Sequence, residues 1–194
     1  MIFVECITNI IVICFKTYIP NLKDTISLYK AIEGNPQDSA LKKLFTELCP
    51  HNNELDDIMI KCSALNDFYS TNIFDVTSMA KHILQQDIDA RLSVGDPTLA
   101  ETIGKISERY FYSFATKYCA FHQPHLYNIY DSHVHNILMY FSNRDKYAHH
   151  THQSLRDYAS FKDAISKFQK FYHLESLNAW ELDKYLWQLG INFK

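Results

Sequence analysis

The chain has 194 residues and a formal net charge of −3, with 47% hydrophobic and 21% charged residues and only four glycines and five prolines. This composition is typical of a folded globular domain and differs from that of a disordered chain. So few turn-forming residues argue against barrels and sandwiches. The spacing of the glycines excludes the phosphate-binding glycine loops. Because the net charge is negative, contact with nucleic acid requires a local basic patch.

The N-terminal segment is apolar. The run Ile7–Phe15 has nine residues between Glu5 and Lys16, whereas a membrane-spanning helix needs about 20. The positive region that opens a signal peptide is absent, because the first charge is Glu5. We therefore expect a buried first helix over residues 2–18 and a cytoplasmic protein. The scattered cysteines agree with a reducing compartment and form no iron–sulfur motif: Cys6, Cys14, Cys49, Cys62 and Cys119.

Helix-start signals divide the rest of the chain. Asn35-Pro36 predicts a helix that ends near Cys49-Pro50, and Asp96-Pro97 predicts the start of another. That second helix carries apolar residues at helical spacing, at Leu99, Ile103 and Ile106. Near the C-terminus, the spacing of Asn178 and Glu181 is typical of a capping box, and Gly190 is typical of a helix end.

Aromatic and aliphatic side chains recur on one face of two further segments, which predicts helices packed into a core. These are Tyr110, Phe111, Phe114, Tyr118 and Phe121, and then Leu155, Tyr158, Phe161, Ile165 and Phe168. We find no alternating strand pattern and no Gly/Ser-rich linker. The prediction is one all-α domain over residues 1–194 with about nine to ten helices, in which N-terminal helices of residues 1–55 pack on a core of residues 56–194.

Asp131 stands where one of the predicted helices begins, after a turn at Pro124. An aspartate there has a structural explanation, because it caps free backbone N–H groups. However, Tyr130-Asp131-Ser132-His133-Val134 resembles the (V/Y)-D-(T/S)-(H/x)-V element of the helix-hairpin-helix (HhH-GPD) DNA glycosylase superfamily. Upstream, Tyr69-Ser70-Thr71-Asn72-Ile73 is similar to the Q-x-T-D-x element of that superfamily. The two elements follow in the family's order and at its distance, and the resemblance covers about residues 60–190.

The resemblance implies an HhH-GPD-like fold and a glycosylase that flips and excises a base. Cleaving an N-glycosidic bond develops positive charge on the sugar, which a carboxylate stabilises, and Asp131 matches the family's catalytic aspartate. Tyr69 matches the residue that fills the gap in the duplex. Its neighbours are the candidate residues of the base pocket: Asn66, Phe68, Thr71, Asn72 and Phe74. The polar members of this set equally suit a helix face bonded to neighbouring loops.

The family's DNA-binding hairpin falls near Ser107–Tyr112, which contains no glycine. Positive charge from Lys105 and Arg109 is then expected to contact DNA, together with Ser113 and His133. Lyase members carry a lysine 18 or 19 residues before the aspartate, where this chain has Ser113 and Tyr112. Lys117 lies 14 residues before Asp131, so a monofunctional enzyme is expected. A Schiff base and AP-lyase activity through Lys117 remains an alternative, as does a buried amine paired with an acid.

The expected partner is double-stranded DNA with a modified base, bound by a monomer without a cofactor. By size and divergence the chain resembles bacterial defence glycosylases that remove hypermodified phage bases such as glucosylated hydroxymethylcytosine. Repair of damaged bases is the alternative substrate class. Ten histidines are present, but they lie mostly in predicted loops without cysteine partners, so we expect no metal site.

Two other functions compete with this prediction. The spacing of Arg144 and His149 matches the R-x(4)-H signature of HEPN ribonucleases, in which both residues lie on one helix. A non-enzymatic helical binding module, in which Asp131 serves only as a cap, is the third possibility.

Overall fold

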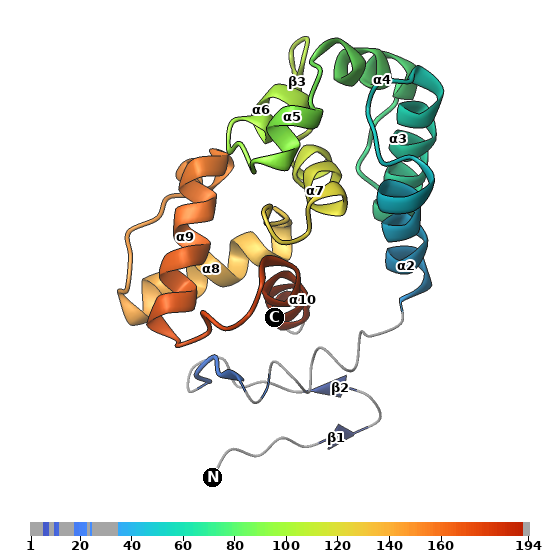
Figure 1. The fold of residues 1–194 in the computed structure, drawn as a ribbon. Coiled ribbons are helices and arrows are strands. Elements are labelled where there is room, and N and C mark those ends of the chain that lie inside the picture. Colours follow the sequence, from blue (N-terminus) through green and yellow to red (C-terminus); the bar gives the residue numbers. More distant parts are fainter. Residues whose placement is uncertain (1–5, 8–9, 12–17, 23, 25–34, 192–194) are drawn as a thin grey trace.

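The computed structural model describes residues 6–7, 10–11, 18–22, 24 and 35–191. Within these residues the chain is mainly helical, as the sequence predicts, with nine α-helices labelled α2 to α10 (Figure 1). The elements are α2 (Pro36–Lys43, continued by a π-helical turn Leu44–Leu48), α3 (Leu55–Tyr69), α4 (Val76–Gln85), α5 (Asp89–Ser93), α6 (Leu99–Gly104), β3 (Lys105–Ile106), β4 (Arg109–Tyr110), α7 (Tyr112–His122), α8 (Ser132–Asp145), a 3₁₀ turn (Ser154–Arg156), α9 (Tyr158–Phe171) and α10 (Ala179–Ile191).

The expected helix over residues 2–18 is wrong where the structure describes this segment. Cys6–Ile7 (β1) and Ile10–Ile11 (β2) pair as two short antiparallel strands. The segment is rich in β-branched isoleucine and valine, and such side chains favour extended backbone. The other residues of the predicted helix, except Tyr18, lie outside the described residues.

Three of the predicted helix starts are confirmed by their caps, whereas α6 begins at Leu99, two residues after Pro97, without a side-chain cap. The Asn35 side chain accepts a hydrogen bond from the Gln37 N–H, with Pro36 at the first helical position. Asp131 caps α8 in the same way, accepting from the His133 N–H. Asn178 and Glu181 form the reciprocal capping box, each side chain accepting from the other's N–H. These contacts lie within three residues of sequence, which is why the sequence reveals them.

A β-hairpin formed by β3 and β4 separates α6 from α7 and shortens both of the helices predicted there. α6 ends at Gly104, so Ile106 lies in β3 and Tyr110 in β4, not on helices as expected. The turn places Ser107 at φ +51°, a conformation that is usually left to glycine. A Cβ at Gly104 would lie 2.9 Å from the Tyr110 ring and 3.2 Å from the Ala115 Cβ. The glycine therefore allows the hairpin and α7 to pack closely against α6.

α7 is the central helix of the fold, and ten of its residues, from Tyr112 and Phe114 through to His122, are buried. Figure 1 shows α2 and α3 running along one side of it, α9 along the other, and α8 and α10 below it. α10 packs against α8 with very little space. A Cβ at Gly190 would lie 2.5 Å from the His133 Cβ and 2.9 Å from the His133 backbone carbon and oxygen. Gly190 is therefore a packing residue in the last turn of α10, which extends one residue further, to Ile191, the last described residue.

Candidate functional site

Charged side chains from four helices meet beside α7. We call this group the Lys117 cluster; its members are Asp38 (α2), Lys117 (α7), Asp131 (cap of α8), Asp183 and Lys184 (both α10). Lys117, Asp183 and Lys184 are only 4%, 8% and 9% exposed. Burial of charge is costly unless the groups are paired, and strongly perturbed buried groups concentrate at functional sites. The cluster is therefore the candidate active site.

Lys117 lies at the centre of the cluster. Its Nζ is 3.9 Å from Asp131 Oδ2, donates a hydrogen bond to Ser113 Oγ at 2.7 Å, and lies 5.5 Å from the centre of the Tyr69 ring. Ser113 is one helical turn before Lys117 on α7, so the helix itself brings the two together. Burial lowers the pKa of the Lys117 ammonium, although the Asp131 and Asp183 carboxylates oppose this shift. A lowered pKa increases the fraction of neutral, nucleophilic amine.

Asp131 is the member of the cluster most open to solvent. Its side chain is 22% exposed, against 5% for that of Lys117. One carboxylate oxygen accepts from the His133 N–H at 2.7 Å, and the other faces Lys117. The cap fixes the carboxylate at the N-terminus of α8, where the helix dipole favours negative charge. The residue thus has the capping role that the sequence offered as one of its two alternatives.

The remaining members connect α2, α3 and α10. Lys184 Nζ pairs with Asp38 Oδ2 at 2.5 Å and lies 4.6 Å from the Trp180 ring. The Tyr69 hydroxyl donates to the other oxygen of Asp38. Asp183 has no hydrogen bond within the described part of the chain. Burial raises the pKa of its carboxyl to about 7, against the opposing charges of Lys184 and Lys117.

The predicted base-pocket residues fall into two groups. Tyr69 is half-buried beside the Lys117 cluster, where its hydroxyl donates to Asp38 and its ring packs against Phe121. Asn66 bonds the backbone N–H and C=O of Ile73 and accepts from the Thr71 hydroxyl. Asn66 and Thr71 therefore match the alternative interpretation of the sequence, a polar helix face bonded to the neighbouring loop. Phe68 packs on the core. In that loop, Asn72 is exposed and Phe74 is 83% exposed.

The predicted DNA contacts do not form one patch with Lys117. Lys105 and Arg109 are exposed on the hairpin, Lys105 paired with Glu101 at 2.5 Å. The Arg109 guanidinium lies 5.7 Å from the centre of the Phe74 ring. Ser113 is occupied by the Lys117 ammonium. His133 is half-buried, and its backbone packs against Gly190.

A cavity of about 160 Å³ adjoins the cluster. It is lined by Phe121, Trp180, Pro124 and Ala120, with Lys42, His125, Asn178 and Glu181 among its polar lining residues. Its aromatic walls touch the cluster, because Phe121 packs on Tyr69 and the Trp180 ring lies beside Lys184. Phe121 and Trp180 meet edge to face at 5.2 Å between ring centres.

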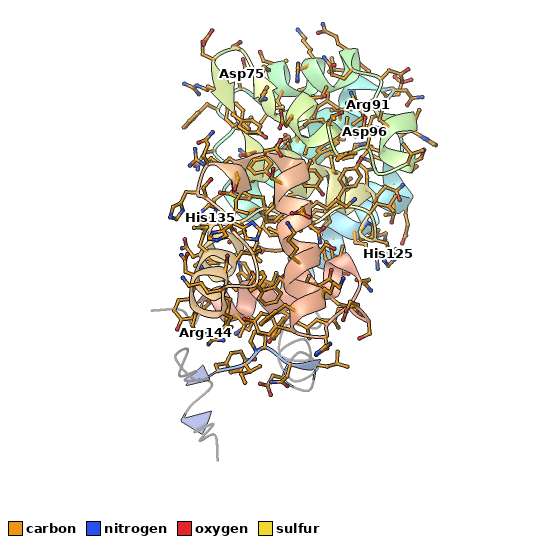
Figure 2. All side chains as sticks on the ribbon, turned by 90° about the vertical axis from the view of Figure 1, so that its left-hand side faces the viewer. Asp75, Arg91, Asp96, His125, His135 and Arg144 are labelled. Atoms are coloured by element: carbon orange, nitrogen blue, oxygen red, sulfur yellow. The ribbon has the colours of Figure 1, made fainter. Side chains whose placement is uncertain are left out.

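The HEPN-type arrangement of Arg144 and His149 is absent from the structure. Arg144 is the penultimate residue of α8 and pairs with Asp145 at 2.5 Å. α8 ends at Asp145, Lys146 adopts φ +56°, and His149 is exposed in the following loop. Figure 2 shows Arg144 at the opposite end of the helical body from Asp75, and from the paired Arg91 and Asp96. Arg144 and His149 therefore do not share a helix.

Two features are absent from the described residues. No group of three or more His, Cys, Asp or Glu side chains is arranged to hold a metal ion among them. In the same part of the chain, no helix has the length and apolar character to cross a membrane.

The sequence did not point to Asp38, Asp183 or Lys184. Adjacent Asp183-Lys184 on an amphipathic helix is typical of a solvent-exposed face, and nothing local reveals that α8 covers it. One signal was available: Gly190, in the same helix, is the residue that allows α8 to approach.

Comparisons with known proteins give a family but not an activity. No solved structure matches the chain. A Haemophilus influenzae protein (strain ATCC 51907 / DSM 11121 / KW20 / Rd), described as "Uncharacterized protein", is 45% identical over 141 residues. The match covers 70% of this chain and 65% of that protein, so the chain spans about two thirds of its relative's length. The family model HI_0787_N, described as an N-terminal domain, matches residues 21–126, more than half of the chain and including Lys117. The chain therefore belongs to the HI_0787_N family.

Proposed function

We propose that this protein is a DNA glycosylase that removes a modified base from double-stranded DNA and leaves an abasic site. The observation that carries the proposal is the contact at the start of α8 between the buried Lys117 Nζ and Oδ2 of the half-buried Asp131, 3.9 Å apart. A carboxylate fixed at this point stabilises the positive charge that develops on the sugar. The amine beside it is the nucleophile for the anomeric carbon, C1′.

The position of Lys117 supports more than hydrolysis alone. Its spacing from Asp131 in sequence favours a monofunctional enzyme, but in the fold its ammonium faces the Asp131 carboxylate directly. Burial also lowers the pKa of the amine. We therefore include in the proposal attack of Lys117 on C1′, with a Schiff base and AP-lyase activity.

The cavity of about 160 Å³ beside Phe121 and Trp180 is the proposed base pocket. Flat aromatic walls suit stacking on an extruded base. A modified cytosine, such as glucosylated hydroxymethylcytosine in phage DNA, is the proposed substrate, and a damaged base is the alternative.

The hairpin and the neighbouring loop are the proposed DNA contact. Arg109 and Lys105 are its exposed cations, and Phe74 is its exposed aromatic side chain. With Tyr69 held inside the Lys117 cluster, Phe74 takes over the proposed role of filling the gap in the duplex. Binding through so few cations should weaken as salt is added.

The test is base release from a panel of duplexes that carry hydroxymethylcytosine, its glucosylated form, uracil, oxidised guanine or alkylated purine. Abasic sites are revealed by alkali, and Schiff bases are trapped with borohydride. Asp131→Asn and Lys117→Met should each lower the rate by about 10²-fold or more. The matched controls Asp163→Asn and Lys167→Met, an exposed ion pair on α9, should behave as wild type.

The panel also separates this proposal from a non-enzymatic helical module. Asp131 does cap α8, so Asp131→Asn is accompanied by a thermal melt to show that the fold is retained. If wild type forms no abasic site on any duplex, the glycosylase proposal is wrong.

A further inference from the structure

Lys117 and Asp131 lie close together without forming a hydrogen bond. Lys117 Nζ is 3.9 Å from Asp131 Oδ2, whereas a hydrogen bond between an ammonium and a carboxylate spans about 2.7–2.9 Å. Both groups are largely removed from water, since their side chains are 5% and 22% exposed. Opposite charges attract more strongly where water is scarce, so another contact has to hold these two apart.

Ser113 holds the ammonium. It lies one helical turn before Lys117 on α7, and its Oγ accepts a hydrogen bond from Lys117 Nζ at 2.7 Å. No other hydrogen bond of Lys117 Nζ is found among the described residues. The serine hydroxyl therefore occupies the place at the ammonium that the nearby carboxylate would otherwise take.

Thr116 fixes the carboxylate from the same helix. Its hydroxyl accepts from the Tyr130 N–H at 3.0 Å and donates to the Ser113 backbone carbonyl at 3.2 Å. Thr116 is completely buried, so water does not compete for these two hydrogen bonds. Asp131 directly follows Tyr130 and is also bound to α8 through its capping hydrogen bond. α7 and α8 together therefore keep Asp131 from moving towards Lys117.

This arrangement leaves one oxygen of Asp131 open. Oδ1 caps α8, but Oδ2 receives no hydrogen bond within the described part of the chain. In the proposed glycosylase, the carboxylate that stabilises positive charge on the sugar has to offer an oxygen to it. An ammonium bound directly to Oδ2 would already neutralise that oxygen.

We propose that Ser113 is a positioning residue, whose hydroxyl holds the Lys117 ammonium away from Asp131 and so keeps one carboxylate oxygen available for the sugar. This inference rests on the proposed function and assigns a further residue of the same site. Ser113 acts through Lys117 and Asp131, and it has no part in bond making or breaking.

The charges around Lys117 set the acidity of its ammonium. Burial lowers the pKa of Lys117, the Asp131 and Asp183 carboxylates oppose this shift, and the Lys184 charge adds to it. Tyr69, from α3, faces the ammonium with its ring and stays protonated, because burial raises the pKa of its hydroxyl. The remaining charged member of the cluster, Asp38 of α2, is bound to Lys184 and Tyr69.

Removal of the Ser113 hydroxyl should change this balance in a direction that can be measured. In Ser113→Ala the ammonium loses its acceptor on α7 and is expected to bind Asp131 Oδ2 directly. A carboxylate stabilises an ammonium more than a neutral hydroxyl does. The pKa of Lys117 should therefore rise in Ser113→Ala. If the ammonium instead stays away from Asp131, loss of the hydrogen bond should lower that pKa.

The first test measures the pKa of Lys117 without any substrate. Lysine ¹³Cε resonances of the 194-residue chain are followed with pH, and the Lys117 signal is assigned by its absence in Lys117→Met. Ser113→Ala should raise the pKa by about one pH unit or more. Ser113→Thr keeps the hydroxyl and should titrate like wild type. Ser113→Cys, with a weakly accepting thiol, gives the same expectation as alanine if Ser113→Ala does not fold.

The second test follows borohydride trapping of the Schiff base on a duplex with one preformed abasic site. In wild type the rate should rise with pH as the amine of Lys117 loses its proton. In Ser113→Ala this rise should move to higher pH, which makes trapping about tenfold slower near pH 7. The matched control is Ser142→Ala, which loses a buried hydrogen bond to the Ala148 carbonyl at the far end of α8. It should keep the wild-type pH profile.

Two results would overturn the inference. One is a Lys117 pKa in Ser113→Ala that equals or falls below that of wild type. The other is trapping that slows equally at every pH, as a purely structural role of Ser113 would produce. Absence of trapping by wild type contradicts instead the lyase step of the proposed function. The pKa of Lys117 in Ser113→Ala then still decides where Ser113 holds the ammonium.

Discussion

The contact between Gly190 and the start of α8 gives the sharpest prediction about the fold. Substituting Gly190→Ala adds a Cβ that would lie 2.5 Å from the His133 Cβ and 2.9 Å from the His133 backbone carbon and oxygen. Ordinary contacts begin at about 3.4 Å, so α8 and α10 would have to separate by about 0.5–0.9 Å. Two of the three atoms are backbone, and therefore no side-chain rotation relieves the overlap.

Two opposing effects set the magnitude. Alanine favours a helix interior over glycine by about 1 kcal/mol, whereas overpacking of a tight contact costs about 1–3 kcal/mol. The backbone overlap puts the cost towards the upper end, so we expect a net destabilisation of about 1–2 kcal/mol. For a chain of this size, that corresponds to a fall in Tm of roughly 2–8 °C.

The assay is thermal unfolding followed by circular dichroism, with Gly104→Ala as the matched control. A Cβ at Gly104 would meet mainly the Tyr110 ring, at 2.9 Å, which is a side chain able to shift. Gly104→Ala should therefore lower Tm less. The reasoning is refuted if Gly190→Ala melts at or above the wild-type temperature, or falls no further than Gly104→Ala. Because Asp131 caps α8, one of the two helices that separate, Gly190→Ala should also slow Schiff-base trapping.

Two further predictions concern the buried hydrogen bonds that join Asn52 to Lys61, Tyr118 and His122. Asn52 Oδ1 accepts from Lys61, Tyr118 and His122, at 2.7, 2.5 and 3.2 Å, and its amide donates to Asp89. Asn52→Ala should therefore lower the free energy of unfolding, measured in urea, by about 3–5 kcal/mol. A loss below about 1 kcal/mol, like that expected for the exposed Asn136→Ala, contradicts this account. Burial holds the pKa of His122 well below its usual value. Below about pH 6.5 the unfolded chain therefore binds a proton that the folded chain does not. As the pH falls further, this group should lower the free energy of unfolding by up to about 1.4 kcal/mol per pH unit. His122→Gln should reduce that slope, and an unchanged slope excludes His122 as its source.

Local signals predicted much of the fold. The caps at Asn35 and Asp131 and the capping box at Asn178 and Glu181 were readable, because each hydrogen bond joins residues two or three apart. The β3–β4 hairpin was missed, since Ser107 takes a turn conformation that normally reveals itself by glycine. The N-terminal strands were missed because an apolar run without periodicity does not distinguish a helix from a strand.

The sequence alone predicted the all-α class, several helix starts, and two of the five charged residues of the candidate site, Lys117 and Asp131. The small number of glycines and prolines argued against sheet folds, and the spacing of the glycines excluded phosphate-binding loops. Only the tertiary structure decided that Asp38, Asp183 and Lys184 join them, because these residues come together through the packing of α2 and α10 against α7 and α8. Burial is a property of that packing, and it is burial that changes the acidity of Lys117 and Asp183.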